Sequence, residues 1–176
     1  MTPPHAVTGL AAVCALGAAA ASTIDLLQGA DPRWTVAASL FLVPPAALLA
    51  AWAWRSATLP YAVLAALGVV VAPLGAVLGD RAGSTSWWLA VEAAWWTGVA
   101  AVAWRSRPGL AVLTAMAAAS ALLAAAFTVL EVPEPAASAA GLRIPMTIVW
   151  ATWVAVDLVL RPTPAELFTL DRSRQA

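Results

Sequence analysis

The sequence contains one cysteine, Cys14, one histidine, His5, and no lysine. A single thiol cannot form an internal disulfide, and a single histidine provides neither a His/Cys metal site nor a credible base for a serine-hydrolase triad. The sequence also lacks the glycine-rich phosphate loops of P-loop and Rossmann proteins and the basic patches of nucleic-acid-binding proteins. We therefore expect no metal, no cofactor and no nucleic-acid partner.

Charged residues are scarce as well. They make up 10% of the 176 residues, and hydrophobic residues make up 62%, whereas soluble domains have about 25% and roughly 45–50%. Polar groups are too few to cover a soluble domain of this size, but bilayer lipid solvates apolar side chains directly. The composition predicts an all-α, multi-pass integral protein of the cell membrane, with the lipid bilayer as its surroundings.

Six apolar segments are long enough to cross a bilayer, because a helix needs about 20 residues to cross the hydrocarbon core. The predicted transmembrane helices cover residues 6–27, 34–54, 59–79, 87–104, 109–130 and 142–160. They form one transmembrane domain, residues 1–160, followed by a short cytoplasmic tail, residues 161–176. The first segment is expected to remain as a helix and not to be cleaved as a signal sequence, because Met1–His5 contains no Lys or Arg.

The sequence Ala-Trp-Arg-Ser occurs twice, at residues 53–56 and 103–106. Each copy ends an apolar segment, and Arg161 ends another at a similar distance, so the six helices are interpreted as three tandem two-helix hairpins. A similar period also arises in any six-helix protein with short loops. With both termini in the cytoplasm, six arginines lie inside and three outside, and this asymmetry favours that orientation.

Prolines interrupt two of the predicted helices. Pro44 and Pro45 fall in the middle of the second segment, and Pro73 falls in the third. Each proline removes a backbone hydrogen bond and is expected to kink or widen its helix. Such kinks serve either helix packing alone or a helix that bends around a cavity.

Three acidic residues lie inside predicted helices: Asp25, Glu92 and Asp157. A charge near the bilayer centre costs about 2.5 kcal/mol or more, so these residues are candidate functional groups. Asp157 precedes Arg161 by four residues and is expected to pair with it, whereas Asp25 is either a boundary charge or a site residue. Glu92 is the strongest candidate because it lies too deep to escape as a terminal charge does, and Arg143 is its expected counter-ion.

The ten tryptophans fall into two groups. Six are expected to form an aromatic belt at the two membrane interfaces: Trp34, Trp52, Trp54, Trp87, Trp88 and Trp104. Four are expected to lie deeper: Trp95, Trp96, Trp150 and Trp153. The helix face that carries Glu92 also carries Trp88, Trp95 and Trp96, and Arg143 and Trp150 share a face of the sixth helix. If these faces meet, the indoles and Arg143 line a substrate pocket; otherwise the deep indoles serve packing.

Acid-initiated cyclisation is the first function that fits this inventory. A buried carboxylic acid would protonate a polyprenyl chain, and indole faces would stabilise the carbocation without metal or nucleotide. Glu92 would donate the proton, with Asp25 or Asp157 second. In size and in its membrane acids the chain resembles small membrane-bound terpenoid cyclases, although no Asn-x-x-Trp-Glu arrangement surrounds Glu92.

Two other functions use the same residues differently. In a solute-binding or transport subunit, the pocket would capture a small hydrophobic or cationic solute with Glu92 as counter-ion, and a partner membrane protein would supply the energy. In a sensory or accessory membrane protein there would be no catalysis. The short, arginine-marked loops are similar to the membrane input regions of some bacterial sensor kinases.

Overall fold

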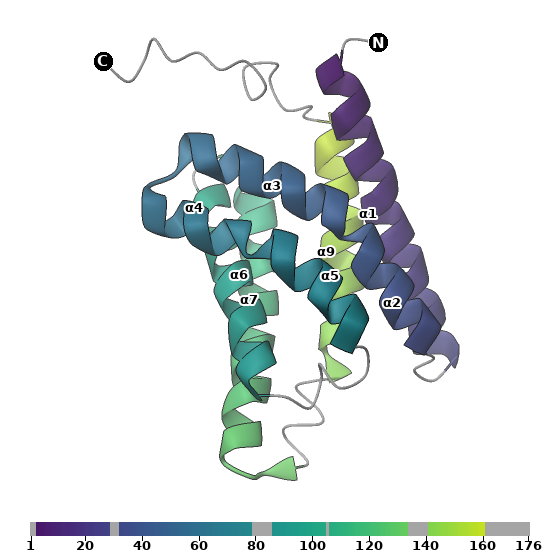
Figure 1. Ribbon diagram of the computed structural model, residues 1–176, viewed down its shortest axis with the longest axis vertical. Coiled ribbons are helices and arrows are strands. Elements are labelled where there is room, and N and C mark those ends of the chain that lie inside the picture. The colour runs from purple at the N-terminus through teal and green to yellow at the C-terminus, as the bar shows by residue number, and fades with distance from the viewer. Residues whose placement is uncertain (1–2, 29–31, 79–85, 105, 134–140, 161–176) are drawn as a thin grey trace.

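The computed structural model describes residues 3–28, 32–78, 86–104, 106–133 and 141–160. Within these ranges the chain forms helices and no β-strand, so the predicted all-α class is confirmed. The helices labelled in Figure 1 are α1 (Pro3–Gln28), α2 (Pro32–Phe41), α3 (Val43–Ser56), α4 (Leu59–Ala66), α5 (Gly68–Leu78), α6 (Ser86–Ala103), α7 (Pro108–Val129) and α9 (Arg143–Leu160). The predicted tail lies outside the described residues.

Four of the predicted segments coincide with the unbroken helices α1, α6, α7 and α9. Their ends agree with the predicted ends to within three residues. Proline helps to set one of these boundaries, because α7 has Pro108 in its first turn. Proline lacks the N–H that would be unpaired at that position, and its φ angle already suits a helix.

The second predicted segment is divided into α2 and α3 at Leu42. Pro44 and Pro45 have no N–H, so the carbonyl groups of Leu40 and Phe41 lose their usual helical partners. The chain stays close to helical through the break, since the Leu42 N–H still donates to the Ala38 carbonyl at 3.1 Å. The interruption predicted from the two prolines is therefore present.

The third segment is also divided, but at Leu67 and not at Pro73, which lies inside α5. Gly68 follows the break, and a Cβ atom built there would lie 2.3 Å from Nε1 of Trp95. No side chain other than glycine's hydrogen fits beneath that indole. The interruption predicted from Pro73 is thus present in the third segment, but it lies nearer the N-terminus, next to Gly68, on which Trp95 packs.

Four helical stretches are long and apolar enough to cross a membrane: Ala6–Gln28, Arg33–Arg55, Pro108–Val129 and Arg143–Leu160. The stretch Leu59–Leu74 is apolar but shorter. Among the described helices, α6 has sufficient length but lower hydropathy, because its 18 residues include Glu92 and four tryptophans.

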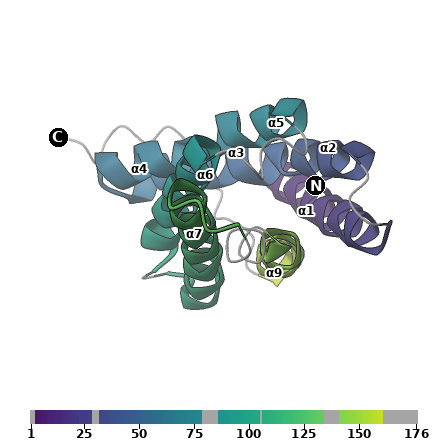
Figure 2. The same cartoon turned by 90° about the horizontal axis from the view of Figure 1, so that it is seen from below.

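The helices form two groups with α6 between them. Seen from below, α2, α3, α4 and α5 lie along one side of the molecule and α7 and α9 along the other (Figure 2). α1 packs against both α9 and α2, and α6 contacts α7 on one side and α3, α4 and α5 on the other. Ten of the 18 residues of α6 are consequently buried. Alanines supply much of the remaining core, and their small side chains allow helices to approach closely.

Candidate functional site

A cavity of about 90 Å³ lies where the interrupted helices meet α6 and α9. It is lined by Thr35, Ser39 and Leu42 from the α2 side, Val71 and Ala72 of α5, Trp88, Glu92, Trp95 and Trp96 of α6, and Arg143 and Thr147 of α9. The interruption between α2 and α3 borders it at Leu42, and Val71 of α5, one turn after the interruption at Leu67, lines it as well. The cavity therefore combines charged, hydroxyl and indole groups from four helices.

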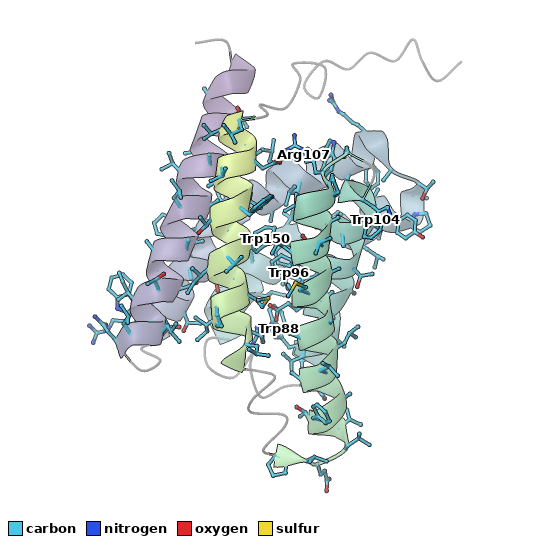
Figure 3. All side chains as sticks on the ribbon, turned by 180° about the vertical axis from the view of Figure 1, so that it is seen from behind. Trp88, Trp96, Trp104, Arg107 and Trp150 are labelled. Carbon is cyan, nitrogen blue, oxygen red and sulfur yellow. The ribbon has the colours of Figure 1, made fainter. Side chains whose placement is uncertain are left out.

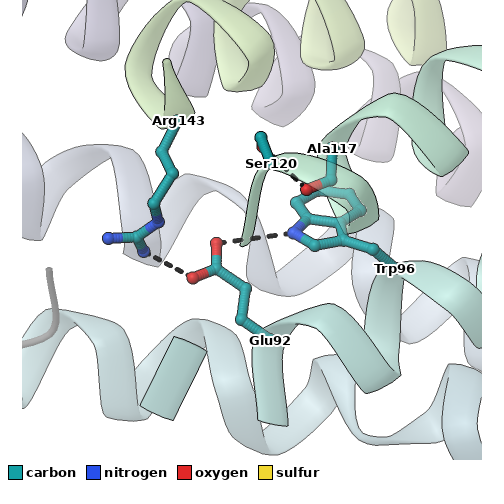
Figure 4. A network of polar contacts seen from close by, with 5 residues as sticks. All are labelled: Glu92, Trp96, Ala117, Ser120 and Arg143. Carbon is teal, nitrogen blue, oxygen red and sulfur yellow. Dashed lines mark hydrogen bonds and ion pairs between the residues drawn. The ribbon is translucent and has the colours of Figure 1, made fainter. Parts of the chain in front are cut away.

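Glu92 and Arg143 form an ion pair on the cavity wall (Figure 4). Nη2 of Arg143 lies 2.5 Å from Oε2 of Glu92, and Nε1 of Trp96 donates a longer hydrogen bond of 3.4 Å to Oε1. Glu92 is only 8% exposed, and charged groups so far from water are stable only when paired. The counter-ion predicted from the sequence, Arg143, is therefore present. The ion pair links Glu92 of α6 to the first residue of α9.

Three tryptophans form a cluster behind the ion pair. The rings of Trp95 and Trp96 stack with centroids 4.2 Å apart, and Trp150 of α9 meets Trp96 edge to face at 4.6 Å. Nε1 of Trp150 donates to Oγ1 of Thr114 at 2.9 Å, and that hydroxyl donates to the Leu110 carbonyl at 2.6 Å. Figure 3 shows Trp96 and Trp150 directed toward one another between α6 and α9. The cluster holds two cavity-lining indoles in fixed orientations.

Asp25 lies behind the cavity wall and not on it. The carboxylate is buried, and Oδ2 accepts a hydrogen bond of 3.0 Å from Oγ1 of Thr35, which itself lines the cavity. Oδ1 is buried and has no hydrogen-bond partner within the described part of the chain. Asp25 is thus connected to the cavity through one hydroxyl group.

Asp157 is separate from the cavity. Its carboxylate pairs with Arg107, which precedes α7, and the Arg107 guanidinium lies 5.5 Å from the ring centroid of Trp52 on α3. The expected partner Arg161 lies outside the described residues. The candidate acid Asp157 therefore joins α9 to the residue that precedes α7 and does not line the cavity.

The remaining sequence candidates divide in the same way. The cavity is lined by three of the candidate tryptophans, Trp88, Trp95 and Trp96. Trp150 packs against Trp96 behind the cavity. Trp153 does neither, since it is 45% exposed and lies against Gly109. Sequence reasoning missed Thr35 and Ser39, which enter the cavity because α2 ends beside it. The signal that indicates them is the Pro44–Pro45 pair, which marks where α2 ends.

No group of three or more His, Cys, Asp or Glu residues suited to a metal ion is found within the ranges that the structure describes. Comparison of the chain with protein-family models, with curated proteins and with solved structures found no match.

Proposed function

We propose that the chain is an integral membrane protein with six membrane-spanning segments arranged as three hairpins, and with both ends of the domain on the cytoplasmic side. The start of α1 and the end of α9 lie at the same end of the molecule (Figure 1), in agreement with an even number of crossings. α6 is 18 residues long, which corresponds to about 27 Å at 1.5 Å per residue, close to the thickness of the hydrocarbon core.

The two Ala-Trp-Arg-Ser copies support the repeated hairpin. Ala53 and Ala103 are both 0% exposed, and Trp54 and Trp104 are 62% and 63% exposed. Equivalent residues thus have equivalent surroundings at the ends of α3 and α6. An alanine packed against the neighbouring helix and a tryptophan turned outward suit a helix that ends at a membrane interface.

Cysteine labelling tests this topology. In a Cys14→Ala background, Thr58→Cys and Ser106→Cys are expected to react with a membrane-impermeant maleimide only after cell lysis, whereas Val132→Cys reacts on intact cells. All three positions are exposed between helices or after one. Labelling of Thr58→Cys and Val132→Cys from the same side would contradict the six-segment arrangement.

Within this membrane domain, we propose that the cavity binds a small molecule and that the protein is a solute-binding or transport subunit. The observation that carries the proposal is the position of the cavity at the interruption between α2 and α3, one turn from the interruption between α4 and α5. In membrane transporters, discontinuous helices that meet near the middle of the bilayer form the substrate site, because irregular backbone is tolerated there only where it lines a cavity.

Two features favour binding over the acid-initiated cyclisation predicted first. Glu92 is held in an ion pair with Arg143, so its carboxyl group is engaged by a protein partner, whereas a proton donor must face the substrate. The cavity of about 90 Å³ is also smaller than the engineered cavity of about 150 Å³ that holds one benzene molecule. A polyprenyl chain needs far more space than either.

Native mass spectrometry of the protein purified from its own membranes tests the binding function. We expect a bound small molecule on the wild-type protein that is lost from Ser39→Phe, since Ser39 lines the cavity. Leu40→Phe is the matched control, because Leu40 is the next residue and is exposed. Retention of the molecule by Ser39→Phe would refute the cavity as the site. Formation of a cyclised product from polyprenyl diphosphate, abolished by Glu92→Gln, would establish the enzyme instead.

A further inference from the structure

The cavity wall carries two opposite charges that cancel. Glu92 and Arg143 are the charged residues among those that line it, and they are paired with each other. A part-buried ion pair of Arg107 with Asp157 is separate from the cavity, and Asp25 is separated from it by Thr35. A ligand with a net charge would introduce an uncompensated charge into a site whose own charges already cancel, which is unfavourable away from water. The site therefore selects against net charge.

Both members of the ion pair retain hydrogen-bonding capacity. Arg143 uses Nη2 on Glu92, and its Nε is buried with no hydrogen-bond partner among the described residues. A guanidinium group has five N–H donors. On the other side, Oε1 of Glu92 receives, from the described residues, the long hydrogen bond of Trp96 alone, although a carboxylate has about four lone-pair sites. A ligand group that donates to Glu92 and accepts from Arg143 would satisfy both.

The size of the cavity and the indoles on its wall further limit the kinds of ligand that fit. A volume of about 90 Å³, against about 150 Å³ for a site that holds the six carbons of benzene, suits a small group of about four non-hydrogen atoms. Trp88, Trp95 and Trp96 line the wall beside Glu92, and indole faces attract cations, most strongly where water is excluded.

Building on the binding function proposed above, we propose that the cavity binds a zwitterionic head group with an ammonium and a carboxylate on neighbouring atoms. The ammonium donates to Glu92 beside the indoles, and the carboxylate accepts from Arg143. One ion pair is thereby exchanged for two, and the net charge of the site stays at zero. No bond is made or broken.

Four compounds with similar apolar chains test this inference. Calorimetry on the protein in lipid nanodiscs would compare norleucine, hexylamine, hexanoate and hexanamide, which are zwitterionic, cationic, anionic and neutral. We expect norleucine to bind tightest, by about tenfold over either singly charged compound, a difference of about 1.4 kcal/mol, with hexanamide in between. Equal or tighter binding of hexylamine or hexanoate would overturn the inference.

Charge-removal variants sharpen the test. Glu92→Gln leaves Arg143 unpaired and is expected to shift the preference to hexanoate, and Arg143→Gln is expected to shift it to hexylamine. The double variant is again neutral and is expected to prefer hexanamide. Arg107→Gln with Asp157→Asn removes the second ion pair and is the matched control, which keeps the wild-type order. Unchanged preferences in Glu92→Gln and Arg143→Gln would contradict the inference.

The outcomes separate this inference from the function on which it rests. If a singly charged compound binds tightest and its binding is lost in Ser39→Phe, the cavity is a binding site but not one for zwitterions. If none of the four compounds binds and no small molecule is found on the purified protein, both proposals are wrong. Where a single variant does not fold, the order of the four compounds on the wild-type protein decides the question.

Discussion

Gly98 sets the closest approach between α6 and α4. A Cβ atom built on Gly98 would lie 2.5 Å from Cβ of Leu64 and 2.6 Å from the backbone nitrogen of Ala65. Non-bonded carbon atoms are stable at about 3.5–4.0 Å. Since one of the clashing atoms belongs to the α4 backbone, a side-chain rotation cannot relieve the contact. Gly98→Ala must therefore displace α4 by about 1 Å relative to α6.

The magnitude follows from two opposing terms. An extra methyl group in a well-packed core costs about 1–3 kcal/mol, and replacing glycine by alanine within a helix contributes about 0.5–1 kcal/mol in favour of folding. We expect Gly98→Ala to lower the free energy of unfolding by about 1–2 kcal/mol. Gly9→Ala is the matched control, because nothing lies within 4 Å of a Cβ atom built there. Only the favourable term applies to Gly9, so that variant is expected to match or exceed the wild-type stability.

Reversible unfolding by sodium dodecyl sulfate in mixed micelles, followed by far-ultraviolet circular dichroism, measures the difference between the two variants. The same substitution in two helices removes the effect of composition, so the comparison isolates the contact between α6 and α4. A Gly98→Ala protein as stable as Gly9→Ala would refute the close packing of these helices.

The remaining predictions concern two polar contacts that join α9 to α7 and to Arg107, which precedes α7. Trp150→Phe removes the hydrogen bond to Thr114 and part of a fully buried ring. We expect the same unfolding assay to show a free energy of unfolding lower by about 1–3 kcal/mol. A change below about 0.5 kcal/mol would mean that the indole N–H is not paired. Arg107→Gln leaves the mostly buried Asp157 carboxylate without this partner, at an expected cost of about 1–3 kcal/mol. Adding Asp157→Asn should restore part of that loss, and a double variant no more stable than Arg107→Gln would argue against the ion pair.

Much of the helix arrangement follows from hydrophobic segments and their ends. α1, α6, α7 and α9 were predicted from segment length, since apolar side chains and helix-ending residues are local signals. The pairing of Glu92 with Arg143 was predicted from helical phase, because one carboxylate and one guanidinium on facing helices have few other partners. Local periodicity therefore indicates which face of a helix carries a group.

Periodicity does not indicate which helices touch. Asp157 pairs with Arg107, 50 positions away, a contact that the i, i+4 rule does not indicate; the predicted partner Arg161 lies outside the described residues. The interruption beside Gly68 has the same cause: Pro73 is a local signal, whereas the break depends on the indole of Trp95 from α6. Thr35 and Ser39 were likewise missed because the cavity arises from the meeting of separate segments.

The position of the candidate site follows from the burial of α6. Among the described helices of 18 residues or more, α6 is the one whose hydropathy falls below that of a typical membrane-spanning helix. Ten residues of α6 are buried, against five in the equally long α9. A helix that faces lipid must be apolar, whereas a helix enclosed by protein can carry a carboxylate, provided that a partner neutralises it. The reduced hydropathy of α6 therefore reflects its central position. If the six-segment proposal is correct, a hydropathy search would overlook the helix that carries Glu92.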